Sequence, residues 1–340
     1  MTTPPELSAE DALRLNVLLA GPVYAVRIDE GARTLHALTP RGEARIALNP
    51  TGRPERYFQR VRELLAGHAL GSPGGYPVYL RRWTRMGQAS EKNLEALLKL
   101  GEPEAVLAVA YAPGLTDELA RRVWWAAQQM ATTEIARVML MHPAVRAGSM
   151  GPVLTAHLLD YLPFESDPLA ALQTVRVVLA AGHLDADARS ALWAKAKRRP
   201  HYLVGFLETL PDALPPEPAR ALPAGLPDTP AARLLARCYS GAGQSYLKAA
   251  ELALDKAPIH EAVYLLLDLI GGYFAAGREA EGLPVPAAEA AALSALARLS
   301  QQDAAPILTR TTAVGPLMRR HLEPLIGPII RHLRTLRGEP

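Results

Sequence analysis

The chain has 340 residues and a formal net charge of +3, from 37 basic and 34 acidic side chains. This small excess of positive charge does not favour a nucleic-acid-binding protein, because such proteins are typically strongly basic. The single cysteine, Cys238, excludes an internal disulfide and indicates a reducing compartment. Apolar residues make up 49% of the chain and aromatic residues only 6%, which favours a helical core over a large sheet.

The first 88 residues predict a small mixed α/β region. Residues 1–7 are expected to form a tail, and Ser8 is a suitable N-cap for a helix that ends before Gly21-Pro22. Turn signals then separate three strand-like runs, which predict a three-stranded β-meander. These runs are 23–28, 34–38 and 44–48. A helix over 54–67 follows.

Beyond residue 88, glycine and proline interrupt a succession of helical patterns, so the region 89–210 is expected to consist of helices. The predicted helices are 90–100, 103–111, 117–130, 133–141, 150–161, 168–181, 186–199 and 201–209. Short connections make consecutive helices antiparallel neighbours, which predicts an irregular, HEAT-like α-helical array. Because proline disrupts a helix interior, we expect the 30 prolines to mark connections between helices.

Seven prolines between residues 211 and 230 exclude a regular helix there, and we interpret this segment as a linker or an extended surface strap. A C-terminal helical region, 231–340, follows it. The predicted helices there are 230–240, 243–256, 259–277, 286–300, 303–310 and 316–336. The N-terminus does not resemble a signal peptide, and the longest apolar run is too short to span a bilayer, so we expect a cytoplasmic protein without membrane association.

The stretch from Leu70 to Gln88 concentrates glycine, proline, aromatic and arginine residues. Its glycines suit a backbone nest for an oxyanion such as sulfite, sulfate or phosphate, with arginines supplying forked charge. Its aromatic and arginine side chains also suit a partner-binding surface. The candidate residues are Gly71, Ser72, Gly74, Gly75, Tyr76, Tyr79, Arg81, Arg82, Trp83 and Arg85. The alternatives are a tight turn with solvated arginines, which the missing phosphate-loop lysine favours, and core packing of the aromatics.

Other candidate groups have structural alternatives that the sequence favours. Cys238 would be a reactive thiol if activated, but it lies in an apolar helical pattern typical of a buried cysteine. At most one of Trp124 and Trp125 can point inward from a helix. Ser149 is interpreted as a helix cap rather than a nucleophile. The nine histidines lack ligand spacing, so no metal site or other cofactor is expected.

Four segments carry a resemblance to a known family. Besides 70–88, they are 13–20 (LRLNVLLA), 112–122 (APGLTDELARR) and 147–154 (AGSMGPVL). Together they resemble the sulfur reduction protein DsrS family, which is encoded alongside the dissimilatory sulfite reductase system of sulfur-oxidising bacteria, over roughly the first two-thirds of the chain. The resemblance implies a cytoplasmic accessory protein of sulfur oxidation and carries over no catalytic residue.

We therefore expect a non-catalytic accessory or regulatory protein that acts by binding a protein of the Dsr system. One alternative is a carrier or enzyme for a sulfur species or an oxyanion, using Cys238 or the cluster Arg81–Arg85. A second alternative is an RNA-level regulator, in which the basic helix ends near 195–199 and 319–337 contact RNA. Solvated helix ends are the simpler interpretation of those basic residues. The oligomeric state stays open.

Overall fold

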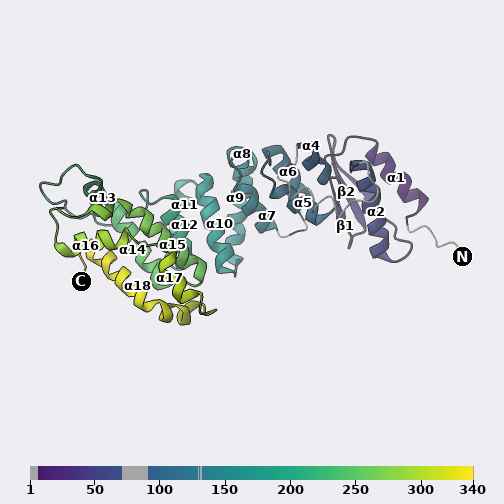
Figure 1. Cartoon of the computed structure of the whole chain (residues 1–340). Helices are drawn as coiled ribbons and strands as arrows, with labels where there is room; N and C mark the ends of the chain where they lie inside the picture. Colours follow the sequence, from purple (N-terminus) through teal and green to yellow (C-terminus); the bar gives the residue numbers. More distant parts are fainter. Residues whose placement is uncertain (1–6, 71–90, 129, 131, 340) are drawn as a thin grey trace. The chain divides into compact units, whose positions relative to one another are not determined.

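We describe the fold from a computed structural model, in which residues 7–70, 91–128, 130 and 132–339 are described. Among these residues helix predominates, with 17 α-helices and one small antiparallel sheet near the N-terminus, as Figure 1 shows. This confirms the predicted mainly α fold with a three-stranded β-meander. None of the helices in the described part of the chain is both long enough and apolar enough to cross a bilayer.

The chain divides into two compact units, Met1–Asp160 and Tyr161–Pro340, which we describe separately. The first unit begins with a helix, the β-meander and a second helix. These elements are α1 (Ala9–Leu19), β1 (Ala25–Asp29), β2 (Thr34–Thr39), β3 (Gly42–Ala47) and α2 (Pro54–Leu70). The strands lie in the order β1-β2-β3, so β1 and β3 are the two edges of the sheet.

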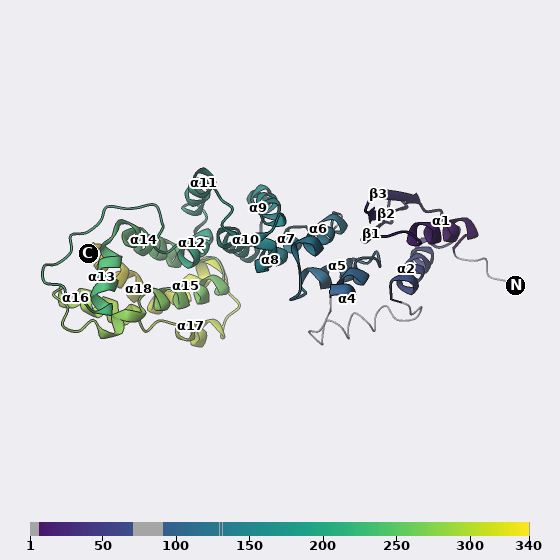
Figure 2. The ribbon, with the colours of Figure 1, turned by 90° about the horizontal axis from the view of Figure 1, so that it is seen from above.

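The alternation of side chains gives the sheet two different faces. Val26, Leu35 and Ala37 are fully buried on one face, in a core shared with residues of α1 and α2. The opposite face carries Arg27, His36 and Arg45, which the strand register places side by side. On that side β1 contacts a helix of the following run, α6 (Asp117–Ala126), so the sheet lies between α1 and α2 on one side and α6 on the other (Figures 1 and 2).

A buried aspartate ties the start of α1 to the sheet and to α2. Ser8 caps α1, because its side chain accepts a hydrogen bond from the Asp11 N–H at 3.0 Å. The Asp11 carboxylate in turn accepts hydrogen bonds from the Tyr57 hydroxyl (2.7 Å) and from Asn49 (3.2 Å). Burial raises the pKa of Asp11, but these hydrogen bonds outweigh it and hold the pKa below its usual value.

The remainder of the first unit is a run of helices in which those from α4 to α8 contact the next one or two along the chain. The helices are α4 (Glu91–Leu97), α5 (Pro103–Ala110), α6, α7 (Thr132–Leu140), α8 (Pro143–Ala147) and α9 (Met150–Tyr161). Such near-neighbour packing is typical of helical arrays. The short helix α8 was not predicted: Pro143 occupies its first turn, where proline is favourable, rather than marking only a break.

The second unit contains nine α-helices and three short 3-10 helices among its described residues. They are η1 (Leu162–Phe164), α10 (Pro168–Ala181), α11 (Ala186–Ala196), η2 (Pro200–Tyr202), α12 (Leu203–Thr209), α13 (Pro230–Tyr239), α14 (Gly241–Asp255), α15 (His260–Tyr273), η3 (Ala275–Glu279), α16 (Ala287–Leu296), α17 (Gln301–Leu308) and α18 (Gly315–Arg337). The long helix α18 packs against both α14 and α16 (Figure 2). The C-terminal helices therefore also make contacts between elements far apart in the sequence.

The expectation that prolines mark only connections is wrong at three positions. Pro306 lies inside α17, and Pro324 and Pro328 lie inside α18. Each removes an N–H from the helix, a local cost that packing can offset. α18 has such packing, because one of its faces is buried along its length. The buried residues of that face are Met318, Leu322, Ile326, Ile329, Leu333 and Leu336.

The proline-rich segment 211–230 lies within the second unit and is attached to it at several points. The Glu217 N–H donates to Gly241 O (3.0 Å), and the Arg220 N–H donates to Tyr239 O (2.9 Å). Leu214 is buried, and the Arg220 side chain reaches Glu289 of α16 at 2.9 Å. These contacts are those of a strap that follows the surface of the unit.

Candidate functional site

The ten candidate residues between Gly71 and Arg85 fall in 71–90, outside the described residues. Both interpretations of that stretch, as an anion-binding nest and as a partner-binding surface, therefore stay predictions. The Arg81–Arg85 cluster belongs to the same stretch and also lies outside the described residues. The described part of the first unit contains a different candidate, which no sequence motif indicated.

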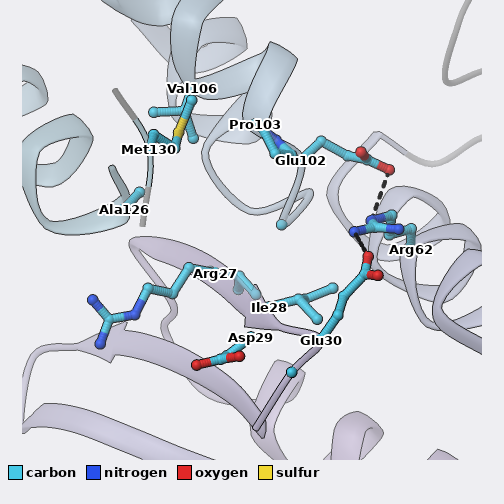
Figure 3. Close-up of a pocket in the computed structure, with 13 residues that line it drawn as sticks. Arg27, Ile28, Asp29, Glu30, Arg62, Glu102, Pro103, Val106, Ala126 and Met130 are labelled. Carbon is cyan, nitrogen blue, oxygen red and sulfur yellow. Dashed lines mark hydrogen bonds and ion pairs between the residues drawn. The ribbon is translucent and has the colours of Figure 1, made fainter. Parts of the chain in front are cut away.

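This candidate is a cleft of about 330 Å³ beside β1 (Figure 3). Its walls come from β1 and the turn after it, from α2, from the start of α5 and from the end of α6. The chain between α4 and α5 crosses the outer edge of β1, where the Val26 N–H donates to Leu98 O at 2.8 Å. Four separate parts of the first unit thus converge on the cleft.

Gly101 permits the close approach of this crossing segment to the strand. Its backbone has φ +66°, which glycine adopts readily and other residues rarely. A Cβ atom at this position would lie 3.0 Å from the Cδ1 atom of Ile28. The glycine that the sequence marks as a helix break therefore also sets the position of Glu102, the next residue, at the rim of the cleft.

One end of the cleft is charged. Arg62 lies between two carboxylates: its Nη2 donates to Glu30 Oε1 at 2.5 Å, and its Nε lies 3.1 Å from Glu102 Oε1 (Figure 3). The second of these is an ion pair without hydrogen-bond geometry, and the buried Nε has no hydrogen-bond partner among the described residues. We call Glu30, Arg62 and Glu102 the charged triad.

The carboxyl group of Glu102 has a raised pKa. Its side chain is only 13% exposed, and this burial raises the pKa of the carboxyl to about 7. The nearby Arg62 lowers the pKa, while the carboxylates Glu104 and Glu30 raise it further. Near neutral pH the carboxyl is therefore divided between its neutral and its ionised form, and a cation placed beside it would favour the ionised form.

The other end of the cleft is apolar. This wall consists of Val106 of α5, Ala126 at the end of α6, and Met130, which follows α6 in the chain (Figure 3). Ile28 lies between the two ends, and Asp29 adds a further carboxylate from β1. An apolar wall beside a few convergent charged groups is the usual composition of a binding site.

Arg27 lines the cleft but directs its guanidinium away from the charged triad (Figure 3). The guanidinium contacts His36 and Glu43 in a second polar cluster, on the face of the sheet that is turned toward α6. Glu43 is the centre of that cluster. It contacts His36 at 2.9 Å, Arg45 at 2.9 Å and the indole N–H of Trp125 at 3.1 Å. The hydrogen bond from His36 is the main cause that lowers the pKa of Glu43 to about 2. This cluster connects the sheet to α6 through the hydrogen bond from Trp125 to Glu43. The charged triad is the cluster whose side chains lie at the cleft itself.

Two of the segments that carry the family resemblance are joined by one carboxylate. Asp117, in the first turn of α6, accepts hydrogen bonds from Ser149 N (2.9 Å), Ser149 Oγ (2.7 Å) and Met150 N (3.0 Å) at the start of α9. The sequence predicts Ser149 as the cap of this helix, and Ser149 immediately precedes α9. The hydrogen bonds at this helix start are accepted by the Asp117 carboxylate. A Cβ atom on Gly148 would lie 2.2 Å from Asp117 Cγ, so a larger residue at this position would displace the Asp117 side chain.

The reactive-thiol interpretation of Cys238 finds no support in the geometry. Cys238 is completely buried in α13. Burial raises the pKa of its thiol to about 12, and the neighbouring Arg237 lowers it by less than burial raises it. A thiolate, which is the reactive form, is therefore scarce at neutral pH.

The remaining sequence candidates have structural partners. Trp124 and Trp125 are both partly exposed; Trp124 packs edge-on against His157, and Trp125 packs against Arg27. The basic residues of 195–199 are exposed at the end of α11, as expected for a solvated helix end. In the parts of the chain that are described, no group of three or more histidine, cysteine or acidic residues is placed to hold a metal.

Comparison with protein-family models, with curated proteins and with solved structures finds no match for this chain. The sequence did not single out the charged triad because its members share no motif and are separated by 30 to 40 residues. Glu30 lies in a turn, Arg62 in α2, and Glu102 immediately before α5. One weak signal was available. Glu102-Pro103 is a helix start at a glycine break, and a carboxylate there is common for reasons unrelated to binding.

Proposed function

We propose that this protein is a cytoplasmic accessory or regulatory protein of sulfur oxidation that acts by binding a protein of the Dsr system, and that the cleft beside β1 is part of its binding surface. The observation that carries the binding role is the cleft itself. It combines an apolar wall with a partly buried triad in which two carboxylates share one arginine. The Dsr assignment depends on the resemblance of the four segments.

The helical architecture supports a binding role. Runs of helices that contact mainly their neighbours present extended surfaces, and proteins built in this way commonly bind other proteins. In the first unit the cleft lies where this run meets the sheet, so its two sides belong to differently folded regions. Mutation of its rim therefore tests the binding surface without changing a buried core residue.

The alternative of a sulfur carrier that uses Cys238 is disfavoured by the burial of this residue and by the raised pKa of its thiol. The alternative of an oxyanion site at Arg81–Arg85 falls outside the described residues. An RNA-level role depends on the basic helix ends, and no feature of the described structure singles it out. It is therefore an outcome of the test rather than a second proposal.

The test is affinity capture of the tagged full-length chain from sulfur-oxidising cells, with mass spectrometry and RNA recovery on the same eluate. Glu30→Lys reverses one charge at the exposed rim of the cleft, and Glu281→Lys makes the same change at an exposed position of the second unit. We expect Dsr proteins to be recovered with the wild type and with Glu281→Lys, and to be depleted at least tenfold with Glu30→Lys.

Three other outcomes would count against the proposal. Recovery of RNA without Dsr proteins would replace the accessory role with RNA-level regulation. Recovery of neither would contradict the accessory role. Equal recovery of Dsr proteins with all three chains would retain the accessory role and show that the cleft is not the binding surface.

A further inference from the structure

We propose that an extended segment of the protein partner pairs with the outer edge of β1 inside the cleft, through main-chain hydrogen bonds, and places an amide side chain against Arg62. The inference rests on the proposed function, which supplies the partner. It adds the chemistry that the cleft recognises, because the bound segment would extend the sheet by one strand.

The outer side of β1 carries main-chain groups that point away from the sheet. β1 is an edge strand, and its only strand partner in the described sheet is β2. Along a strand, the N–H and C=O groups of successive residues are directed alternately to its two sides. The Val26 N–H is directed outward, because it donates to Leu98 O at 2.8 Å. Ile28, two residues further on, therefore directs its N–H and C=O to the same outer side, and it lines the cleft.

The pairing between β1 and β2 gives the same alternation. Leu38 O accepts a hydrogen bond from the Tyr24 N–H at 2.8 Å, so Leu38 directs its main chain toward β1. His36, two residues earlier in β2, does the same, and its register partner is Arg27. Residues that lie opposite each other alternate between hydrogen-bonded and non-hydrogen-bonded pairs, so Arg27 faces β2 and its neighbour Ile28 faces outward.

The segment that crosses β1 between α4 and α5 does not run along this edge as a paired strand. After Leu98, the N–H groups of Lys99 and Leu100 donate to carbonyl groups of α4, at 3.1 and 3.2 Å. The cleft follows the edge beyond this crossing, because residues 26–31 line it without interruption. Its volume of about 330 Å³ suits a short extended segment.

The cleft also contains a buried donor that lacks an acceptor. Arg62 Nε has no hydrogen-bond partner among the described residues, and its contact with Glu102 is an ion pair without hydrogen-bond geometry. A buried donor of this kind is unfavourable, so an acceptor on the bound segment would stabilise the complex. A carboxylate would meet the like charges of Glu30 and Glu102. A side-chain amide avoids this repulsion, because its oxygen accepts from Nε and its NH₂ group can donate to a carboxylate.

The two sides of the sheet determine which side chains the segment needs. Ile28 packs against the core that α2 shares with the sheet. The residue of the added strand that lies opposite Ile28 would point to this same side, where α2 carries Arg62. Its two neighbours would point to the other side, toward Ala126 and Met130 (Figure 3). The cleft therefore suits an amide residue between two apolar residues.

The test uses the ²H,¹⁵N-labelled full-length chain and the blocked peptide Ala-Val-Gln-Val-Ala as the probe. The comparison is the same peptide N-methylated at its three central residues, which keeps the side chains and removes the N–H donors for pairing in either strand direction. With the plain peptide we expect a saturable NMR shift of the Ile28 amide, and hydrogen exchange at this amide slowed about tenfold or more. The N-methylated peptide should bind about tenfold more weakly or not at all.

The role of Arg62 is tested with a second peptide, Ala-Val-Leu-Val-Ala, which lacks the amide. It should bind the wild type about fivefold more weakly than the glutamine peptide. Arg62→Lys keeps the positive charge and lacks Nε, so we expect it to fold and to bind the two peptides within about twofold of each other. Arg60→Lys changes an exposed arginine of the same helix that does not line the cleft, and it should retain the fivefold difference of the wild type.

Each result supports or contradicts a stated part of the proposal. Equal binding of the plain and N-methylated peptides, or no saturable shift at Ile28, would overturn main-chain pairing. An undiminished preference for the glutamine peptide in Arg62→Lys would overturn the role of Arg62. Peptide binding at Ile28 without capture of Dsr proteins would support this inference and contradict the proposed function. Capture of Dsr proteins without peptide binding would do the opposite.

Discussion

Arg62 in the first unit and Arg220 in the second each pair with a partly or fully buried carboxylate, but they differ in how completely these groups are hydrogen-bonded. Arg220 donates to Glu289 Oε1 (2.9 Å) and to Leu336 O (2.8 Å), and the Tyr239 hydroxyl donates to the other oxygen of Glu289. Arg62 forms one hydrogen bond, to Glu30, and its Nε has no hydrogen-bond partner in the described part of the chain.

This difference separates a structural cluster from a candidate binding cluster. Glu289 is only 8% exposed and accepts hydrogen bonds at both oxygens, so its network fixes the strap 211–230 against α16 and α18. The charged triad borders a cleft, and its Arg62 Nε is buried without a hydrogen-bond partner among the described residues. A buried polar network is favourable when every member is satisfied, and incomplete satisfaction is most readily explained where a ligand completes it.

The largest expected effect tests the structural side of this comparison. Arg220→Ala leaves the buried Glu289 carboxylate without its cation and removes one of the two donors to Leu336 O. We therefore expect the free energy of unfolding of the second unit to fall by about 3–5 kcal/mol. Urea denaturation measures this change. Arg233→Ala is the matched control, because Arg233 pairs with Asp228 at the exposed surface and should cost about 0.5 kcal/mol or less.

A loss below about 1 kcal/mol in Arg220→Ala would show that the Arg220 network does not hold the strap. The interpretation of the Arg220 cluster as a structural element, in contrast to the Arg62 cluster, would then be wrong. A loss in the expected range, with little change in the control, would show that the strap is an integral part of the second unit.

The next prediction concerns Glu102 in the cleft, where the substitution should raise the free energy of unfolding instead of lowering it. The pKa of Glu102 is about 7 in the folded chain, against a usual value of 4.5 for an exposed glutamate. Between these two pH values the folded chain therefore holds a proton that the unfolded chain has lost. Wild-type stability therefore falls as pH rises from about 4.5 through 7. Glu102→Gln lacks this loss, so it should be more stable than the wild type by about 2 kcal/mol at pH 8.5, allowing for partial solvent screening.

Unfolding curves at pH 4 and pH 8.5 measure this difference, which should nearly vanish at pH 4. A variant that is less stable than the wild type at pH 8.5 would mean that the Arg62–Glu102 ion pair outweighs the burial of the carboxylate. The charged triad would then resemble the Arg220 cluster, and the distinction between the two would disappear.

Sequence patterns predicted the elements of the fold far better than the candidate site. Ser8 and the turn signals indicated α1 and the β-meander, because these depend on local chemistry. The side-by-side position of Arg27, His36 and Arg45 follows from strand alternation once the register is known. Glu102 differs: its raised pKa depends on burial against α2 and the turn after β1, which no local pattern encodes.

The smallest expected effect concerns a third carboxylate, Asp117, which accepts all its described hydrogen bonds from Ser149 and Met150 at the start of α9. Burial raises the pKa of Asp117, but these donors outweigh it and the pKa lies below its usual value.

Asp117→Asn keeps one carbonyl acceptor and loses the charge that favours a helix N-terminus, so it should cost about 1 kcal/mol. Asp187→Asn, at an exposed position in the first turn of α11, is the control and should cost less. Urea denaturation at pH 7 measures both. Because Asp117 is neither as buried as Glu289 nor placed beside a cleft, equal losses in both variants would show that capping between α6 and α9 contributes no more than an ordinary exposed carboxylate.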